Sequence, residues 1–382
     1  MQDRVPLYPG RVTLNPVAGQ ANTYDMVRAD QPTQEGTPLN KATLLKDVTA
    51  SILGLPNTAV PDDAFLALTI GVGTYGYRVK IQLADGTPVE GATVSGITAL
   101  TGSTLVSGTD GIVLGKSTSK TVTIGCTSPY IDQAPPTSQS VTAAGTITDV
   151  TLTLSGNTDT IPVSSSQIVK VSPMAKTMDV TAVGGGGGGG SGTDESITWP
   201  GGGGGGGGYA TTKTNITGVA NQNLNITIGS GGTGGAARRG ASGALGGTTS
   251  IMIGNVTVVT ANGGAGGSGN TTSQTVSGGA GNGKGGDGSS SGNSAGANGT
   301  AHIFNNPSLG IAGGGGGGGG GYDATSVAGG YPNGGNGYVY RSSGGVHSGS
   351  DGKPFGGGGG GGGYNYAGYA GGAGGVYLRF HF

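Results

Sequence analysis

The chain has 382 residues and a formal net charge of −1 at pH 7, and 91 of its residues are glycine. So little net charge, with only 10% charged residues, argues against the clustered Lys and Arg that neutralise nucleic-acid phosphates. Glycine occurs in unbroken runs, which excludes the glycine-every-third-residue pattern of collagen. A single cysteine, Cys126, excludes an intrachain disulfide framework.

The sequence shows no sign of membrane insertion or of a leader. No stretch approaches the ~20 consecutive apolar residues of a membrane-spanning helix. The first residues lack the apolar segment of a signal peptide, so we expect synthesis in the cytoplasm without a leader. Glycine is also unevenly distributed, with 17 glycines in residues 1–183 and 74 in residues 184–382. This step in composition predicts a domain boundary at 184.

Residues 1–68 read as an extended arm with one short helix. The prolines between Pro6 and Pro38 prevent a regular helix or a central strand there. Apolar residues then recur at near-helical spacing from Leu45 to Leu55, and Gly54 and Pro56 end that pattern. One short helix cannot form a core alone, so the arm is expected to dock on another surface.

The stretch Glu35–Leu45, EGTPLNKATLL, with Pro61–Phe65 after it, resembles the N-terminal part of tail proteins from phages and prophages of Gram-positive hosts. The resemblance implies that residues 1–68 attach to tail or baseplate proteins. An ordinary terminal extension is the alternative interpretation.

Residues 69–155 alternate apolar and polar side chains in short segments separated by turn residues. The segment from Tyr77 to Leu83 is typical, and Asp85-Gly86 follows it as a turn signal. Segments of this kind predict an antiparallel β-sandwich. The residues Ala84–Val94 with Thr109-Asp110-Gly111 resemble transthyretin-like (carboxypeptidase-regulatory-like) modules, which implies a spacer without chemistry of its own.

The second half of the chain is built around glycine runs, and residues 156–183 are expected to be strands that connect to it. Three of the runs end in tyrosine. Short strand-like segments separate the runs, which are Gly184–Gly190, Gly201–Gly208, Gly313–Gly321 and Gly356–Gly363.

A glycine run either remains a flexible linker or forms a polyglycine II helix with three residues per turn. The matched lengths favour packed helices. The predicted fold class is therefore mostly β, with an arm carrying a short helix, an antiparallel β-sandwich, and a glycine-rich domain of strands and polyglycine II helices over 184–382.

The order of segments also resembles a family. Val180–Val183 entering a glycine run, a second run ending at Tyr209, and Ile226–Gly232 look like the glycine-rich C-terminal domain of phage tail fibres. The closing residues Gly371–Leu378 fit the same pattern. More distantly, the sequence is similar to adhesins of T-even-like phages, in which polyglycine helices present loops to a receptor.

This resemblance implies a receptor-binding tail protein that resides in the tail of a virion or phage-like particle. Its receptor on the bacterial surface would be a glycan, teichoic acid or surface protein, bound through residues 184–382. We also expect a homo-oligomer, and trimers are common in the fibres it resembles. A structural tail or baseplate component is an alternative function.

Enzymatic chemistry is not expected. From residue 184 onward the chain has few carboxylates, and a glycosidase requires a pair of them in one cleft. The histidines show no metal-ligand spacing, so neither a metal site nor a cofactor is predicted. A tail-associated cell-wall hydrolase is therefore the less favoured alternative.

Aromatic residues are the better candidates for function. Tyrosine combines a rigid apolar ring with a hydroxyl group and suits binding surfaces. The candidates for receptor binding are Tyr331, Tyr338, Tyr340, Arg341, His347, Tyr366 and Tyr369. Four others are predicted to pack against the glycine scaffold, namely Tyr209, Tyr322, Phe355 and Tyr364. The alternative for the first group is that these tyrosines also only cover the glycine helices.

Overall fold

The computed structural model describes residues 5–6, 12–18, 24–28, 32–34, 55, 58, 60–70, 74–100, 103–134, 138–144, 147–194, 200–272, 274–290, 297–300, 327–330, 333–340 and 346–382. The chain is mostly β, with 37% strand and almost no helix, which confirms the predicted fold class. It divides into two compact units. Unit 1 consists of residues 1–127 and 136–153, and unit 2 consists of residues 128–135 and 154–382.

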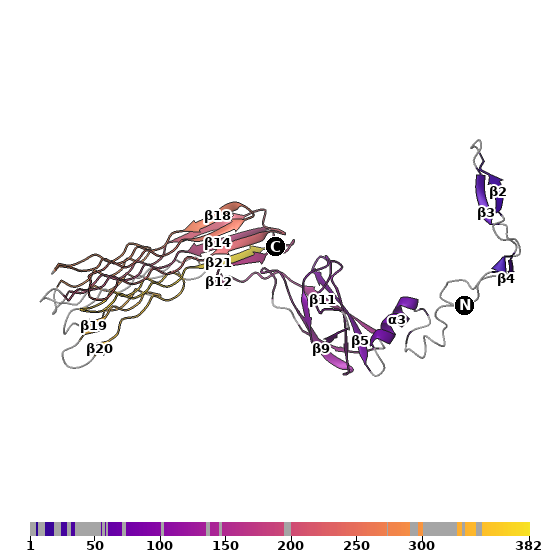
Figure 1. Cartoon of the computed structure of the whole chain (residues 1–382), viewed down its shortest axis with the longest axis horizontal. Helices are drawn as coiled ribbons and strands as arrows, with labels where there is room; N and C mark the ends of the chain where they lie inside the picture. Colours follow the sequence, from indigo (N-terminus) through magenta and orange to yellow (C-terminus); the bar gives the residue numbers. More distant parts are fainter. Residues whose placement is uncertain are drawn as a thin grey trace. The chain divides into compact units, whose positions relative to one another are not determined.

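Unit 1 contains two short antiparallel pairs near the N-terminus. They join β1 (Val5–Pro6) to β4 (Pro32–Gln34), and β2 (Val12–Pro16) to β3 (Tyr24–Arg28) (Figure 1). The helix expected between Leu45 and Leu55 lies outside the described residues.

The described helix of unit 1 is α3 (Pro61–Ile70), which the sequence interpretation did not identify. Proline at the first helical position is favourable because that residue has no intrahelical partner for an N–H group. The Asp63 carboxylate accepts a hydrogen bond from the Val60 N–H, at 3.0 Å, and so caps the helix start.

The predicted antiparallel sheets of unit 1 are present in the structure. One sheet has the order β11-β5-β8-β7 and the other β10-β9-β6. Their strands are β5 (Tyr75–Leu83), β6 (Thr93–Ser95), β7 (Thr98–Ala99), β8 (Ile112–Ser117), β9 (Thr121–Thr127), β10 (Gln139–Thr142) and β11 (Ile147–Leu154). Alternate residues of β5, among them Val79 and Ile81, are fully buried, as the period-two pattern indicates. Cys126 is also buried, and burial raises the pKa of its thiol.

Unit 2 begins with two four-stranded antiparallel sheets, ordered β12-β21-β14-β15 and β13-β16-β17-β18. The strands are β12 (Ile161–Val163), β13 (Gln167–Lys170), β14 (Thr177–Val183), β15 (Ala210–Ile216), β16 (Asn223–Thr227), β17 (Thr249–Ile253), β18 (Val256–Ala261) and β21 (Gly375–His381). Both sheets contribute to one core, in which Val180 and Phe380 of the first sheet join Leu224 and Ile251 of the second. The strands expected as connectors over 156–183 therefore belong to unit 2.

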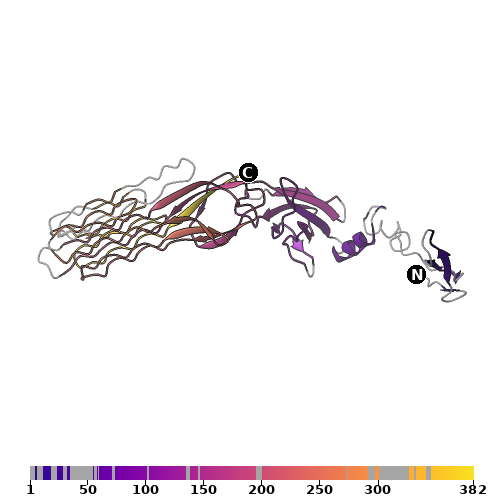
Figure 2. The ribbon, with the colours of Figure 1, turned by 90° about the horizontal axis from the view of Figure 1, so that it is seen from above.

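Each central strand of these sheets continues into a glycine-rich segment that runs away from the sheets (Figures 1 and 2). Strand β14 leads directly into Gly184–Gly190, and Gly201–Gly208 returns directly into β15. The sheets therefore fix the starting positions of the extended segments, and we call this part of unit 2 the sheet end.

The glycine segments hydrogen-bond to one another with a repeat of three residues. Every third N–H of the run Gly184–Gly190 donates to the same neighbour, the returning run. These bonds are 2.8–2.9 Å long and join Gly184 to Tyr209, Gly187 to Gly206 and Gly190 to Gly203. The backbone hydrogen bonds of a β-strand alternate between two opposite sides, with a period of two residues. In a helix with three residues per turn, successive N–H groups point in three directions about 120° apart. The described runs are therefore polyglycine II helices, as the sequence predicted.

Six described segments surround the first run. Its N–H groups donate to three antiparallel neighbours, and its carbonyl groups accept from three parallel ones. The donating contacts reach segments 201–209, 241–247 and 369–372, and the accepting contacts come from segments 232–235, 264–270 and 359–362. We call this assembly the glycine lattice. Buried backbone groups require partners, and here the neighbouring backbones supply them.

The centre of the lattice, around Gly184–Gly190, leaves no room for side chains. A Cβ atom built on Gly187 would overlap the backbone carbonyl of Ala265, and one built on Gly186 would overlap that of Gly357. Because the obstacle is backbone on every side, no rotamer change can relieve it. This packing explains why the run Gly184–Gly190 contains only glycine. The run Gly313–Gly321 lies outside the described residues.

Candidate functional site

Loops between the glycine helices gather at the end of the lattice that is remote from the sheets, which we call the loop end. The chain runs outward and back through the lattice, so each outward segment is followed by such a loop. The described or partly described loops at the loop end are 191–200, 236–240, 271–276 and 364–367. Segments distant in sequence thereby expose their loops on one surface.

A stacked tyrosine pair lies at the loop end. The rings of Tyr338 and Tyr366 are 4.1 Å apart between centroids, with an interplanar angle of 23°. Tyr338 is only 2% exposed and Tyr366 is 43% exposed. The Tyr338 N–H donates to the carbonyl of Gly361 near the end of the fourth run, which holds this strand segment against the lattice. The buried ring of Tyr338 therefore supports the ring of Tyr366, and the ring of Tyr366 is exposed to solvent.

Tyr369 lies close to this pair and is half-buried. Burial raises the pKa of its phenol, a backbone hydrogen bond with Gly349 lowers it, and the charge of Asp351 raises it further. The Asp351 carboxylate in turn accepts a hydrogen bond from the Ala370 N–H, at 2.9 Å, which fixes the carboxylate beside the returning segment. The cluster is therefore rigid, with Tyr366 as its exposed member.

Three of the predicted site residues, Tyr331, Tyr322 and Arg341, lie outside the described residues. Tyr340 and His347 belong to the antiparallel hairpin of β19 (Val339–Tyr340) and β20 (Val346–His347). This hairpin follows Tyr338 in the chain. The structure therefore brings Tyr338, Tyr366 and Tyr369 together, with the hairpin continuing from the first of them.

The residues predicted to pack against the scaffold lie at both ends of the lattice. Phe355 stacks on Tyr377 of β21 at the sheet end, with ring centroids 4.7 Å apart. Tyr209 also lies at the sheet end, where it precedes β15, and is 41% exposed. Tyr364 lies at the loop end. Although both tyrosines follow glycine runs, they occupy opposite ends because those two runs are antiparallel.

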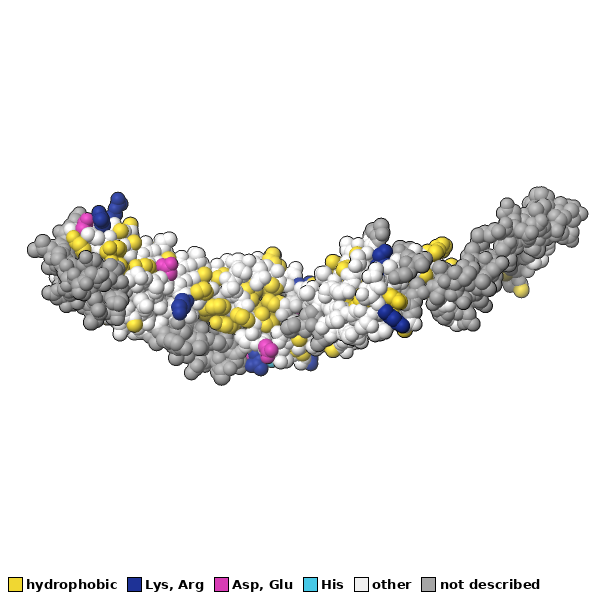
Figure 3. All heavy atoms as spheres, turned by 90° about the horizontal axis from the view of Figure 1, so that it is seen from below, with side chains coloured by type: hydrophobic (Ala, Val, Ile, Leu, Met, Phe, Trp, Pro, Cys, Tyr) yellow, Lys and Arg dark blue, Asp and Glu magenta, His cyan; other side chains and the backbone are white. Residues whose placement is uncertain are grey.

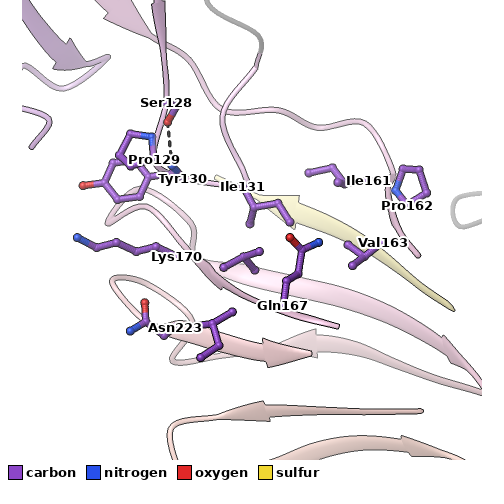
Figure 4. A pocket seen from close by; sticks show the side chains of 12 residues that line it. Ser128, Pro129, Tyr130, Ile131, Ile161, Pro162, Val163, Gln167, Lys170 and Asn223 are labelled. Atoms are coloured by element: carbon purple, nitrogen blue, oxygen red, sulfur yellow. Dashed lines mark hydrogen bonds between the residues drawn. The ribbon is translucent and has the colours of Figure 1, made fainter. Parts of the chain in front are cut away.

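A groove of about 530 Å³ lies at the sheet end of unit 2 (Figure 4). Residues 128–131 form one wall, and β12 and β13 form the other. The ammonium group of Lys170 lies 5.4 Å from the centroid of the Tyr130 ring. Buried Asp132 accepts hydrogen bonds from the backbone and hydroxyl of Ser172, at 2.9 and 2.5 Å. These contacts attach the segment 128–135 to unit 2.

Two further findings concern chemistry and membranes. Within the described residues, no group of three or more His, Cys, Asp or Glu side chains could hold a metal ion. No described helix is long and apolar enough to cross a membrane.

Sequence reasoning did not identify Arg238 and Arg239, which stand in the loop 236–240 at the loop end. Their only signal in the sequence is an adjacent basic pair within a segment otherwise made of small and polar residues. Their loop leaves the lattice next to the loop that carries Tyr366 because the glycine helices behind the two loops are neighbours, and uniform glycine sequence carries no such information.

The fold and the loop end together define a glycine-rich β-protein whose polyglycine helices extend from a two-sheet core. The glycine-rich domain family matches residues 161–381, more than half of the chain, and the chain belongs to this family. The match includes the strands from β12 onward, which agrees with the extent of unit 2. No curated protein matches the sequence.

Proposed function

We propose that the protein is a receptor-binding tail protein of a phage or phage-like particle. Its glycine-rich unit would hold the loop end against the surface of a bacterial cell. The observation that supports this most directly is the exposed ring of Tyr366, backed by the buried ring of Tyr338 on a rigid lattice. A rigid aromatic side chain binds with little loss of conformational entropy, and so suits a recognition surface.

The remaining parts receive roles within this proposal. Residues 1–68 attach to tail or baseplate proteins, the sheets of unit 1 act as a spacer, and the particle carries several copies. Several copies convert weak contacts into lasting attachment. A homo-oligomer, with a trimer as one form, would supply such copies. Sequence resemblance supports the tail assignment, while the geometry supports binding at the loop end.

Binding of the fluorescently labelled full chain to a panel of Gram-positive strains tests this proposal. The Tyr366→Ala variant should weaken binding to a susceptible strain about tenfold, because truncating a central aromatic typically costs more than 1 kcal/mol. Tyr209→Ala is a matched control, since Tyr209 is 41% and Tyr366 43% exposed, but at opposite ends of the lattice.

The control should bind as the native chain does. Saturable binding that both variants reduce equally would contradict a site at the loop end. If the folded chain binds no strain in the panel, a purely structural tail component becomes the better assignment. Release of sugars from purified cell wall would instead support a hydrolase.

A further inference from the structure

Two adjacent arginines project at the loop end. Arg238 and Arg239 are both exposed, and within the described residues neither forms an ion pair. Figure 3 shows basic side chains at this end of unit 2, next to hydrophobic ones and to an acidic one. Exposed guanidinium groups without an internal partner are available to an outside ligand.

The backbone at Arg238 adopts a conformation that arginine disfavours. Its φ angle is 63°, in the left-handed region where glycine and asparagine are favoured. Gly240 in the same loop has φ 55°. Backbone strain at an exposed residue that forms no ion pair within the described part of the chain is typical of a functional position.

The arginine loop and the tyrosine loop are neighbours. The Gly368 N–H donates to the Gly235 carbonyl, at 2.9 Å, where each of the two loops joins its glycine helix. The Gly371 N–H donates to Gly232 one turn deeper, at 2.8 Å, so the two helices stay paired along the lattice. Arg238 and Arg239 therefore leave the lattice beside the loop that carries Tyr366.

The described charges at this end are predominantly positive. Among the described residues, Asp194 is the acidic residue near this loop, since Thr193 and Arg239 form a β-bridge; Glu195 follows it in the chain, outside the described residues. Elsewhere in the lattice, Lys284 pairs with Asp287 at 3.1 Å, and Asp351 accepts a hydrogen bond from the Ala370 N–H. Within the described residues of these two loops, one carboxylate therefore lies beside two guanidinium groups, which favours an anionic ligand.

We propose that the ligand of the loop end is an anionic glycan, with Arg238 and Arg239 binding its phosphate or carboxylate groups and Tyr366 packing on a sugar ring. Guanidinium groups bind both anions through paired hydrogen bonds. An aromatic ring covers the apolar face of a sugar. This inference rests on the proposed function and specifies its ligand class.

Direct binding of the full chain to immobilised polymers tests the inference independently of cells. The probes are a polyol-phosphate polymer that carries sugar substituents, polygalacturonate as a carboxylate polymer, and dextran as a neutral control. Arg238→Gly and Arg239→Gln should each weaken binding to the preferred polyanion about fivefold to tenfold. Lys213→Gln, which removes an exposed positive charge from β15 at the sheet end, should leave binding unchanged. Asp194→Asn should strengthen it.

The outcomes separate the ligand class from the proposed function. Binding to either polyanion that weakens in the arginine variants, and as salt rises from about 50 to 500 mM, supports the inference and identifies the anion. Equal binding to dextran, or arginine variants that bind as the native chain does, would overturn it. Cell attachment that survives in a variant carrying both Arg238→Gly and Arg239→Gln overturns the inference but leaves the proposed function intact. Polyanion binding without cell attachment overturns the proposed function.

Discussion

The sheets of unit 1 and the glycine lattice of unit 2 are two different solutions to the problem of a buried backbone. In unit 1, strands pair edge to edge, and side chains such as Val79, Ile81 and Ile124 fill the interior. In the lattice, the interior is backbone, and hydrogen bonds in all directions replace side-chain packing. The comparison shows that a compact interior requires satisfied polar groups and close packing, but not large apolar side chains.

The strongest test of this difference is a substitution that adds a methyl group inside the lattice. Gly187→Ala places a Cβ against the backbone carbonyl of Ala265, which cannot move without disturbing further neighbours. We expect unit 2 to lose more than about 4 kcal/mol of its free energy of unfolding, a cost usually seen only for severe disruption. Calorimetry of the full chain should show a lowered unit 2 transition and an unchanged unit 1 transition.

Gly254→Asn is the matched control for that variant. Gly254 has φ 57° and no atom within 4 Å of a Cβ position, and asparagine tolerates this conformation. Its transition should stay close to that of the native chain. If the alanine variant melts like this control, the lattice is not closely packed as described.

The corresponding test in unit 1 is a substitution that leaves a cavity in its side-chain core. Ile81→Ala removes a fully buried side chain and should cost about 3 kcal/mol, the usual range for such truncations being 2–5 kcal/mol. Only the unit 1 transition should move in calorimetry. Val106→Ala serves as control because Val106 is 46% exposed, and it should change stability by less than about 0.5 kcal/mol. Equal effects of the two variants would contradict a side-chain core.

A smaller effect, of opposite sign, is expected in the loop 236–240. Arg238→Gly should relieve about 1 kcal/mol of backbone strain, reduced by the greater entropy of glycine in the unfolded chain. Arg239→Gly should give no such gain, because Arg239 is not among the residues with positive φ. Thermal melting of the two variants measures the difference. A lower melting temperature for Arg238→Gly than for Arg239→Gly would contradict strain at Arg238.

The smallest effect concerns alkaline pH. Burial raises the pKa of the Tyr377 phenol above its ordinary value near 10. The neutral phenol therefore contributes stability to the folded chain. This contribution is complete below the unfolded-state pKa near 10 and is lost as pH rises through the folded-state pKa, because the unfolded chain ionises first. Tyr377→Phe keeps the ring against Phe355 and removes the ionisation. Denaturant titrations from about pH 9 to 11 should show a shallower loss of stability in this variant than in the native chain; an unchanged slope would exclude this contribution.

The sequence predicted the structure correctly where the residue pattern of a segment determines its backbone conformation. The period-two alternation over Tyr77–Leu83 identified a strand, and matched glycine runs identified polyglycine helices. It placed one boundary after residue 155, next to Leu154 where unit 2 resumes, and another at 184, where composition changes. Composition changes at 184 because the strands need apolar side chains for the core, whereas the glycine run that continues β14 has no room for any.

The candidate site was less accessible from sequence. A crowded set of tyrosines indicated the correct segment of the chain, but not that Tyr338 is buried beneath Tyr366. Tyrosine after a glycine run suggested one shared role for Tyr209 and Tyr364, yet antiparallel runs place them at opposite ends. Neighbour relations among identical glycine helices depend on the whole lattice, so no local pattern could reveal them or the placement of Arg238.

The three-residue repeat of hydrogen bonds has a consequence for how this unit can change in length. One glycine added to Gly184–Gly190 would rotate every later N–H group by about 120°, so that each would face the wrong neighbour. Three added residues restore the directions and lengthen the helix by about 9 Å. Lengthening one helix also requires the same addition in its neighbours. The unit can therefore grow or shorten only in whole turns, made in concert across the lattice.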